Sequence, residues 1–475
     1  MPVRRFASAS VLLSGLSAAA TTLVPLLIFI YLARRLDAPA IGAVIYAVTV
    51  VEMLKAICPL GLYEAVLSSD DYPAAAPVAG GILAGVAGVA TLLFVAVMLV
   101  SATQMPTLHD RIWYALAIGL KLPFDILVLQ PQAHLVKQLK VRQLASRGLL
   151  ANAGAAAAGV GAAAIWGAMI GLVLYYLAQA AIIWIATRIG AGLGTHEAAL
   201  GWRYDGAVAR ALVPVAWPAS QVRMLGAVNS YADQLVTGVT LGPADLARYN
   251  LGKRTEVAQF GVAGSLIGIL YQPRFVQRDA PHEVRHYFRQ ALLLFALCCG
   301  IPAVLFAVNA GMLVPLVFGG QWAAAAPIAA ALALGGFARA FGAVHGSYQS
   351  LNGDNRDVRN RSVVSAASGL LVLAVAPIAG LIAVAVLVAT KNLLITLWGM
   401  VRLRALAGLR VYLRVAGLPL AGALAGAVAG LWLGRALPDA AWLTPDLRGL
   451  LLSLLLGGIG GIVGAVPALR AAVRR

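Results

Sequence analysis

The sequence predicts an all-α membrane protein of about fourteen transmembrane helices, in two six-helix lobes followed by two C-terminal helices. Hydrophobic residues make up 61% of the 475 residues and charged residues only 11%, whereas a soluble domain is about half apolar and a quarter charged. Apolar runs of roughly 18 residues or more, long enough to span a bilayer, recur to the C-terminus. Ala, Gly and Leu dominate these runs, which suits closely packed helices.

Each apolar run defines one expected span, with ends accurate to about three residues. The first follows Arg4 and Arg5, as a secretory signal would, but it exceeds the apolar length of such a signal, so we interpret it as a membrane helix. The expected spans are 11–32, 41–67, 77–100, 112–134, 144–165, 168–189, 211–239, 245–271, 288–309, 326–349, 361–378, 380–401, 415–436 and 448–469.

The net charge of +18 follows the loops between these spans. With the N-terminus inside, most loop Lys and Arg are cytoplasmic, as the positive-inside rule requires. We therefore expect a multi-pass protein of a bacterial inner membrane with both termini cytoplasmic. Nucleic-acid binding is excluded because no soluble basic domain is present. The opposite loops hold only Arg34, Arg35, Arg111, Arg435 and Arg448.

The longest expected connection divides the chain. It predicts an N-lobe of six helices at 1–190, a cytoplasmic linker at 191–210, a C-lobe of six helices at 211–403 and two extra helices at 404–475. No loop is long enough to hold a soluble catalytic domain.

A short internal repeat supports this division. The turn 36–42 (LDAPAIG) leads into a helix with Tyr46 and Glu52. The turn 241–246 (LGPADL) leads into a helix with Tyr249 and Glu256. Both turns join the opening helices of a half on the outer side, which predicts a parallel repeat about the membrane normal, a transporter architecture.

Cations inside the spans are the main functional signal. Seven of them at similar depth would cost roughly 20 kcal/mol if they faced lipid, so we expect them to line a wet, cationic cavity that binds phosphate or carboxylate groups. Some stand one turn from a carboxylate, and for these mutual neutralisation is the structural alternative. The predicted substrate-binding residues are Lys55, Lys121, Arg223, Lys253, Arg254, Arg339 and Lys391.

Acidic residues and prolines inside the spans give weaker predictions. Glu52, Asp125 and Asp233 are candidates for ion coupling, since a buried carboxylate can exchange a proton between two faces. Pro214 and Pro218 are hinge candidates in the helix that carries Arg223, although ordinary kinks explain them equally well.

Motifs for enzymatic chemistry are missing from the sequence. It has no Walker A sequence, no HExxH and no metal-ligand spacing, so we expect no cofactor, no metal site and no enzyme. Glycine-rich stretches such as 80–88 lie inside apolar spans and predict helix packing. The three cysteines also lie inside spans, as small buried hydrophobic residues.

Several segments resemble the polysaccharide transport, or Wzx-type O-antigen (lipopolysaccharide), flippases of the MOP exporter superfamily. The segment 32–42 (LARRLDAPAIG) is similar to their ArLG…FG motif, although Asp37 replaces the usual Gly. The segment 61–65 (GLYEA) resembles the exit of their second helix, and 318–323 (FGGQWA) the fG..w motif before their tenth. Their seventh and eighth helices are matched by Asp233, Leu241, Gly242, Tyr249 and Pro273.

The resemblance implies a V-shaped, MATE-like transporter that moves undecaprenyl-pyrophosphate-linked oligosaccharide across the inner membrane by alternating access. Its partners would be the lipid-linked glycan, the membrane, and polysaccharide polymerase and export machinery. The alternative in the same superfamily is an ion-coupled multidrug or metabolite antiporter, for which an acidic cavity is expected. A scaffold role in a synthesis complex stays open, but it does not explain the cations inside the spans.

Overall fold

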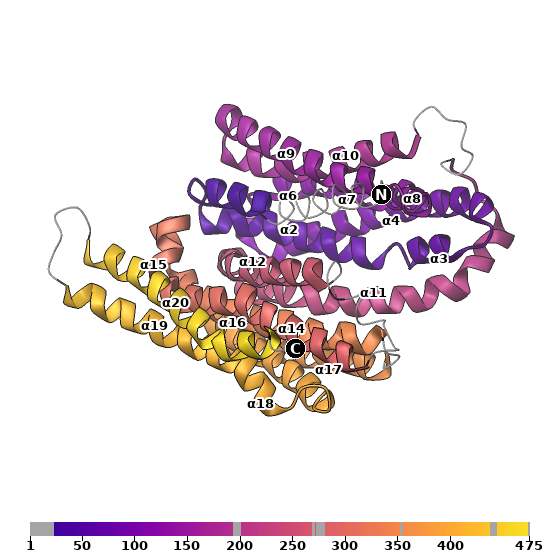
Figure 1. The fold of residues 1–475 in the computed structure, drawn as a ribbon. Helices are drawn as coiled ribbons and strands as arrows, with labels where there is room; N and C mark the ends of the chain where they lie inside the picture. The colour runs from indigo at the N-terminus through magenta and orange to yellow at the C-terminus, as the bar shows by residue number, and fades with distance from the viewer. Residues whose placement is uncertain are drawn as a thin grey trace. The chain divides into compact units, whose positions relative to one another are not determined.

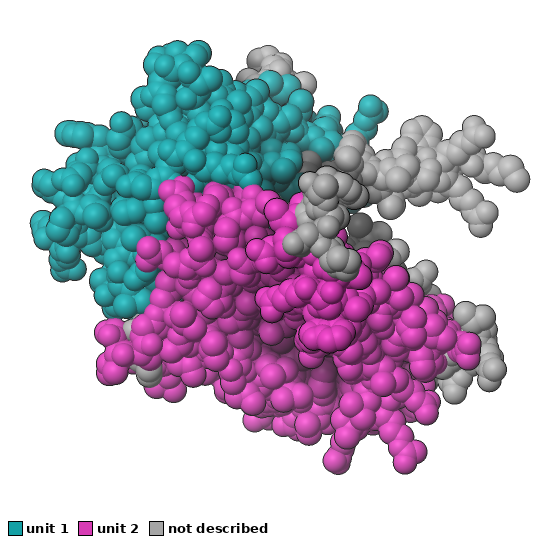
Figure 2. Space-filling view, turned by 90° about the vertical axis from the view of Figure 1, so that its left-hand side faces the viewer, with its two compact units in different colours: residues 1–247 teal, residues 248–475 magenta. Residues whose placement is uncertain are grey.

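The computed structural model describes residues 23–192, 201–267, 271, 281–351, 355–437 and 444–473. The first half of the expected span 11–32 and part of the 191–210 connection lie outside these residues. Within the described ranges the regular elements are all helices, which confirms the predicted all-α class. The described residues form two compact units, 1–247 and 248–475, coloured separately in Figure 2.

Unit 1 contains the described first half of the chain. The helix Leu23–Ala33 comes first. In Figure 1, α9 and α10 run side by side along one face of this unit. The further helices are α2 (Ala38–Ile57), α3 (Leu62–Ser68), α4 (Tyr72–Gln104), α5 (Pro106–His109), α6 (Ile112–Gly119), α7 (Lys121–Leu127), α8 (Leu129–Lys137), α9 (Val141–Trp166), α10 (Ala168–Gly192), α11 (Gly206–Leu241) and the start of α12 (Pro243–Leu266).

Unit 2 contains the rest of α12 and the second half of the chain. The helices α19 and α20 lie against each other over much of their length (Figure 1). Its further helices are α14 (Pro281–Phe295), η3 (Ala296–Gly300), α15 (Ile301–Phe318), η4 (Gly320–Ala325), α16 (Ala326–Leu351), α17 (Asn355–Arg402), α18 (Leu409–Tyr412), η5 (Leu413–Gly417), α19 (Leu418–Ala436) and α20 (Pro445–Val473).

In the described part of the chain, ten helices are long and apolar enough to cross a membrane. The protein is therefore a multi-pass membrane protein, as predicted. The expected spans 211–239 and 245–271 coincide with α11 and α12, which are outside the ten and carry several charges. The count of fourteen, the division into lobes and the cytoplasmic position of the termini stay predictions.

Two helix breaks follow from local sequence. The expected span 41–67 is broken into α2 and α3 at Pro59, where Leu60 and Gly61 take left-handed conformations with φ of 50° and 68°. The expected spans 361–378 and 380–401 are joined in α17 but separated by a kink at Gly380, with φ of 76°. Only glycine adopts such a conformation without strain, so this residue marks the boundary that the sequence predicted.

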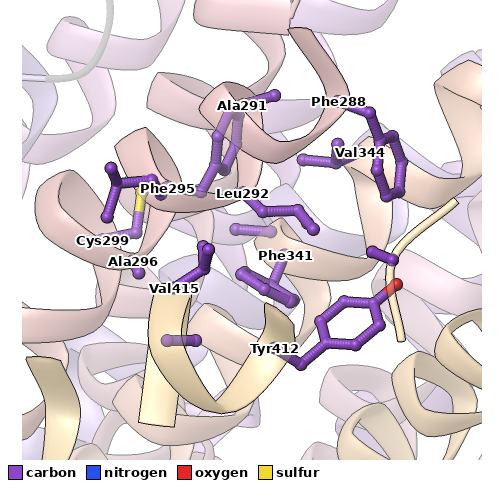
Figure 3. Close-up of a cluster of buried hydrophobic side chains, with 14 of the residues drawn as sticks. Phe288, Ala291, Leu292, Phe295, Ala296, Cys299, Phe341, Val344, Tyr412 and Val415 are labelled. Atoms are coloured by element: carbon purple, nitrogen blue, oxygen red, sulfur yellow. The ribbon is translucent and has the colours of Figure 1, made fainter. Parts of the chain in front are cut away.

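A hydrophobic core fills the part of unit 2 where α14, η3, α16 and the α18–η5 segment meet (Figure 3). Phe288, Phe295 and Phe341 are almost completely buried there. The aromatic ring of Tyr412 reaches the same core, and its hydroxyl oxygen lies 3.0 Å from the Nε2 of the buried His345. These contacts hold α16, the helix that carries Arg339, in place within unit 2.

Candidate functional site

Four charged side chains of unit 1 form one ion cluster, which we call the quartet: Glu52 and Lys55 on α2, and Lys121 and Asp125 on α7. The Lys121 Nζ lies 2.7 Å from the Glu52 Oε1 and also contacts the Asp125 carboxylate. The Lys55 Nζ lies 2.9 Å from the Glu52 Oε2 and 3.6 Å from the Asp125 Oδ2. Each lysine contacts both carboxylates. Because the quartet has two lysines and two carboxylates, its formal charges sum to zero.

Helix geometry explains how the quartet assembles. Glu52 and Lys55 are three residues apart and Lys121 and Asp125 four, so each pair occupies one helix face. Lys55 stands in the last turn of α2, where the negative end of the helix favours a cation. Lys121, the first residue of α7, is only 3% exposed. At that depth a cation needs a paired carboxylate, and the two helices supply two.

Three charged side chains of unit 2 form a second cluster, which we call the triad: Lys253 and Glu256 on α12, and Arg339 on α16. The Lys253 Nζ lies 3.2 Å from the Glu256 Oε2. The Arg339 Nη1 donates a hydrogen bond of 2.9 Å to the Glu256 Oε1. Two cations thus share one carboxylate that is 1% exposed, and the triad keeps one positive charge.

Close helix packing positions the triad. A Cβ added to Gly336 of α16 would lie 2.7 Å from the Glu256 Cα, so only glycine allows the two helices to approach this closely. The Gln259 Nε2 donates a hydrogen bond of 3.1 Å to the Ala333 carbonyl oxygen one turn further along. The Arg339 side chain is 27% exposed, far more than the other two members at 4% and 1%. An anion reaching the triad would therefore meet Arg339 first.

The two clusters occupy equivalent places in the predicted repeat. Glu52 lies in the second expected span and Glu256 in the eighth, each after a buried tyrosine. Each glutamate contacts a lysine three residues away on its own helix and a second cation from the fourth or the tenth expected span. The quartet alone adds a second carboxylate from that partner helix.

Arg223 of α11 has its acidic partner on another helix. Its Nε and Nη2 donate hydrogen bonds of 2.8 Å and 2.6 Å to the Glu64 Oε1 on α3. The guanidinium carbon lies 5.8 Å from the centroid of the Tyr63 ring. The structure therefore pairs a residue that shows no acidic neighbour one turn away in the sequence.

The model of the polysaccharide biosynthesis protein family matches residues 31–327, more than half of the chain. The chain belongs to the polysaccharide biosynthesis protein family. No curated protein matches the sequence. The family assignment confirms the resemblance on which the sequence prediction rested.

Solved structures show which fold the family member adopts. The lipid II flippase MurJ in an inward closed conformation is 11% identical, with 97% of this chain and 100% of that chain covered and a TM-score of 0.73. An inward-facing multidrug resistance MATE transporter of the MOP superfamily is 12% identical, covers 81% and 95% of the two chains, and has a TM-score of 0.60. The TM-scores and coverages show that this chain has the same fold as these two transporters.

A third structure extends the comparison to an archaeal protein. A MOP superfamily transporter from Pyrococcus furiosus Vc1, described as having a binding pocket of reversed polarity, is 10% identical. The match covers 84% of this chain and 96% of that chain, with a TM-score of 0.56. The fold alone therefore does not give the charge of a binding pocket, and the charges of this chain must be taken from its own residues.

The remaining predicted site residues lie on the helices where the sequence placed them. The Arg254 Nε donates a hydrogen bond of 3.2 Å to the Asn250 Oδ1 within α12. Lys391 is half-buried on α17, and its Nζ lies beside Gly369. Asp233 is buried on α11, where its Oδ1 accepts a hydrogen bond from the Gln234 backbone. Their roles in binding or coupling stay predictions.

The hinge candidates Pro214 and Pro218 lie inside α11, which continues through both of them to Leu241. Their role stays a prediction. Among the described residues, no three His, Cys, Asp or Glu side chains lie close enough together to hold a metal ion.

Sequence reasoning missed the partners that lie on other helices, and two of these pairs are far apart in the chain. Glu64 and Arg223 are 159 residues apart, and Glu256 and Arg339 are 83 apart. No spacing along the chain reports such a pair. A signal for the second pair was the glycine Gly336 one turn before Arg339, since glycine inside an apolar helix often marks a close helix approach.

Proposed function

We propose that this family member is a flippase that moves undecaprenyl-pyrophosphate-linked oligosaccharide from the cytoplasmic to the periplasmic leaflet by alternating access. The observation that carries the proposal is the triad itself, in which a lysine and a partly exposed arginine converge on one buried carboxylate. Charges inside membrane segments are costly unless they pair or face water, and for that reason they usually mark a substrate or ion pathway. Arg339 offers planar paired donors, which suit a phosphate better than a lysine ammonium does.

The binding step follows from the contacts of the triad. Glu256 holds the Arg339 guanidinium through Nη1, and Lys253 lies against the other carboxylate oxygen. An arriving pyrophosphate would share the Arg339 guanidinium with Glu256 and be attracted by both cations of the triad. Because Glu256 competes for the same guanidinium, binding stays reversible, as a carrier requires.

Membership of a polysaccharide biosynthesis family and the MOP transporter fold both support this proposal. The alternative is an ion-coupled multidrug or metabolite antiporter. An antiporter of cationic drugs needs a carboxylate that is available to the drug, whereas Glu52, Asp125 and Glu256 are each engaged by two cations. We therefore favour an anionic cargo and a carrier without catalytic activity.

Deletion of the gene followed by complementation tests the proposal. The deletion strain should accumulate the lipid-linked glycan on the cytoplasmic leaflet and lose the surface polysaccharide, and the wild-type gene should reverse both effects. An Arg339→Gln gene expressed at the same level should reverse them at least about tenfold less well, since a lost hydrogen bond to a charged group costs about 1.5–3 kcal/mol.

Arg359→Gln is the matched control, because Arg359 is exposed near the start of α17, and it should complement fully. Unchanged glycan in the deletion strain together with altered drug tolerance would overturn the flippase proposal and support the antiporter. Full complementation by Arg339→Gln would remove Arg339 from the substrate site.

A further inference from the structure

Unit 1 contains an apolar groove of about 500 Å³ between the α2–α3 break, α4, and the start of α11. Its volume lies in the range of small-molecule sites, about 300–1,000 Å³. Side chains from three separate segments line it, and most of them are apolar. Its lining includes Leu60, Ile82, Tyr204, Arg210, Val213 and Trp217.

The walls of the groove are held in place by backbone contacts. A Cβ on Gly61 would lie 2.2 Å from the Ala216 carbonyl oxygen, so α11 rests directly on the α2–α3 break. The Arg203 amide donates a hydrogen bond of 3.0 Å to the Pro77 carbonyl oxygen, and the Gln130 Nε2 donates one of 2.9 Å to the Gly201 carbonyl oxygen. The segment that leads into α11 is thereby fastened to its neighbours, and the groove is preformed.

Backbone strain at the same place points to a function. Leu60 has a φ of 50°, which is uncommon for a residue with a side chain. This conformation directs an exposed leucine into the lining of the groove, although burial would be the ordinary fate of the side chain. Strained backbone of this kind is found most often at functional sites such as ligand clamps.

The lining of the groove combines exposed apolar side chains with one cation, Arg210. Trp217 is 58% and Val213 56% exposed, so the recess offers apolar area to a chain of the same character. Arg210 is also exposed, and its Nε donates a hydrogen bond of 3.1 Å to the Gly206 carbonyl oxygen. The terminal guanidinium nitrogens remain available to an anion. Tyr204 and Trp217 are the residue types that gather at the edge of a bilayer.

We propose that this groove binds the polyprenyl chain of a phosphate-linked carrier lipid, with the phosphate at Arg210. This inference rests on the proposed function, because it names the part of the cargo that this surface receives. The predicted cytoplasmic position of the connection before α11 places the groove in the leaflet from which the cargo would start. The groove is too small for a whole carrier and holds one section of its chain.

Photolabelling of the full-length protein tests the inference. The protein is placed in nanodiscs of phosphatidylcholine with a photoactivatable polyprenyl phosphate, and labelled peptides are mapped by mass spectrometry. Labelling should concentrate on residues 204–217, and unlabelled polyprenyl phosphate should compete at least fivefold better than phosphatidylglycerol. Equal competition by phosphatidylglycerol would identify an ordinary anionic lipid and overturn the inference.

Two matched variants separate the groove from its surroundings. Ala209→Phe places a ring in the groove, since Ala209 lines it, and should reduce labelling at least fivefold. Ala207→Phe adds the same ring to an exposed residue outside the lining and should label as the wild type does. Labelling that Ala209→Phe leaves unchanged, or that falls equally in both variants, would overturn the inference.

The two proposals fail separately. If the deletion strain shows glycan accumulation but the groove is not labelled, the flippase proposal stands and the groove inference falls. If the deletion strain leaves the glycan in place, the flippase proposal falls whatever the nanodisc experiment shows. Specific labelling in that case would still establish a polyprenyl phosphate site on the protein.

Discussion

The quartet and the triad are two versions of one arrangement with opposite electrostatic results. In each, a glutamate on one helix joins a lysine three residues away to a cation on a partner helix. The quartet adds Asp125, so its two lysines face two carboxylates, whereas the three residues of the triad are two cations and one carboxylate. The same scaffold can therefore serve helix packing in one unit and anion binding in the other.

One position accounts for this difference. Asp125 stands four residues after Lys121, and the corresponding residue four after Arg339 is Ala343. Both positions share a helix face with their cation. The partner cation also differs, because Lys121 is a compact ammonium that is 4% exposed whereas Arg339 is a guanidinium that is 27% exposed. A matched set of two lysines and two carboxylates favours a structural role, and a partly exposed guanidinium with paired donors suits the binding of a phosphate.

The largest difference between the clusters should appear when each glutamate is neutralised. Glu256→Gln leaves Lys253 and Arg339 with no carboxylate in the triad, which should destabilise the protein by about 3–5 kcal/mol. Glu52→Gln leaves both lysines of the quartet in contact with Asp125, so its effect should be smaller. Unfolding by denaturant in detergent, followed by circular dichroism, measures both.

The comparison of the two clusters requires Glu256→Gln to destabilise the protein more than Glu52→Gln does. If Glu52→Gln destabilises the protein as much as Glu256→Gln does, then Asp125 does not compensate the lysines, and the quartet is not the neutral, closed network described here. Asp125→Asn serves as the reciprocal control, since it should resemble Glu52→Gln.

Adding a carboxylate to the triad and removing one from the quartet should affect glycan transport very differently. Ala343→Asp gives the triad a second carboxylate and should reduce glycan transport about tenfold or more, because the cargo phosphate would lose at least one charged hydrogen bond of about 1.5–3 kcal/mol. Asp125→Asn gives the quartet a positive charge and should leave transport nearly unchanged. Complementation of the deletion strain at matched expression measures the two.

Ala343→Asn controls for the shape of the new side chain, because it is nearly isosteric with aspartate and uncharged. It should transport better than Ala343→Asp. Wild-type transport by Ala343→Asp, or a loss as deep in Asp125→Asn, would place the cargo phosphate outside the triad.

A smaller loss of stability should follow when the close packing of α12 against α16 is disturbed. Gly336→Ala would place a methyl group 2.7 Å from the Glu256 Cα, so α12 and α16 must separate at a cost of about 1–3 kcal/mol. Gly346→Ala, on the same helix but facing open space, should be neutral or slightly stabilising through helix propensity. Apparent melting temperatures in detergent compare them, and equal values would show that the close approach is not required.

The sequence predicted the helices well because long apolar runs and their breaks are local properties. Gly380 marked the boundary of two spans, and the pairs of Glu52 with Lys55 and Lys253 with Glu256 followed from spacing on one helix. It could not predict which helix brings the second cation, since contacts such as Glu64 with Arg223 depend on tertiary packing. Nor could it show that Asp125 closes a network, because that requires both helices.

The smallest effect on stability should come from removing the charge of Asp205, a carboxylate outside both clusters. Asp205 caps α11 by accepting hydrogen bonds of 2.9 Å and 3.3 Å from the Ala207 and Val208 amides. These bonds hold its pKa below the usual value of 3.8. A lowered folded-state pKa means that the stabilisation is present above the unfolded-state pKa and disappears as the pH falls through the folded-state value.

Asp205→Asn keeps a capping oxygen but removes the charge. The variant should therefore melt at a slightly lower temperature than the wild type at pH 7, and the difference should shrink as the pH falls below 3.8. Because all other carboxylates are common to both proteins, the difference between the two melting curves isolates Asp205. A difference that is constant from pH 7 to pH 3 would assign the cap to hydrogen bonding alone, without a contribution from charge.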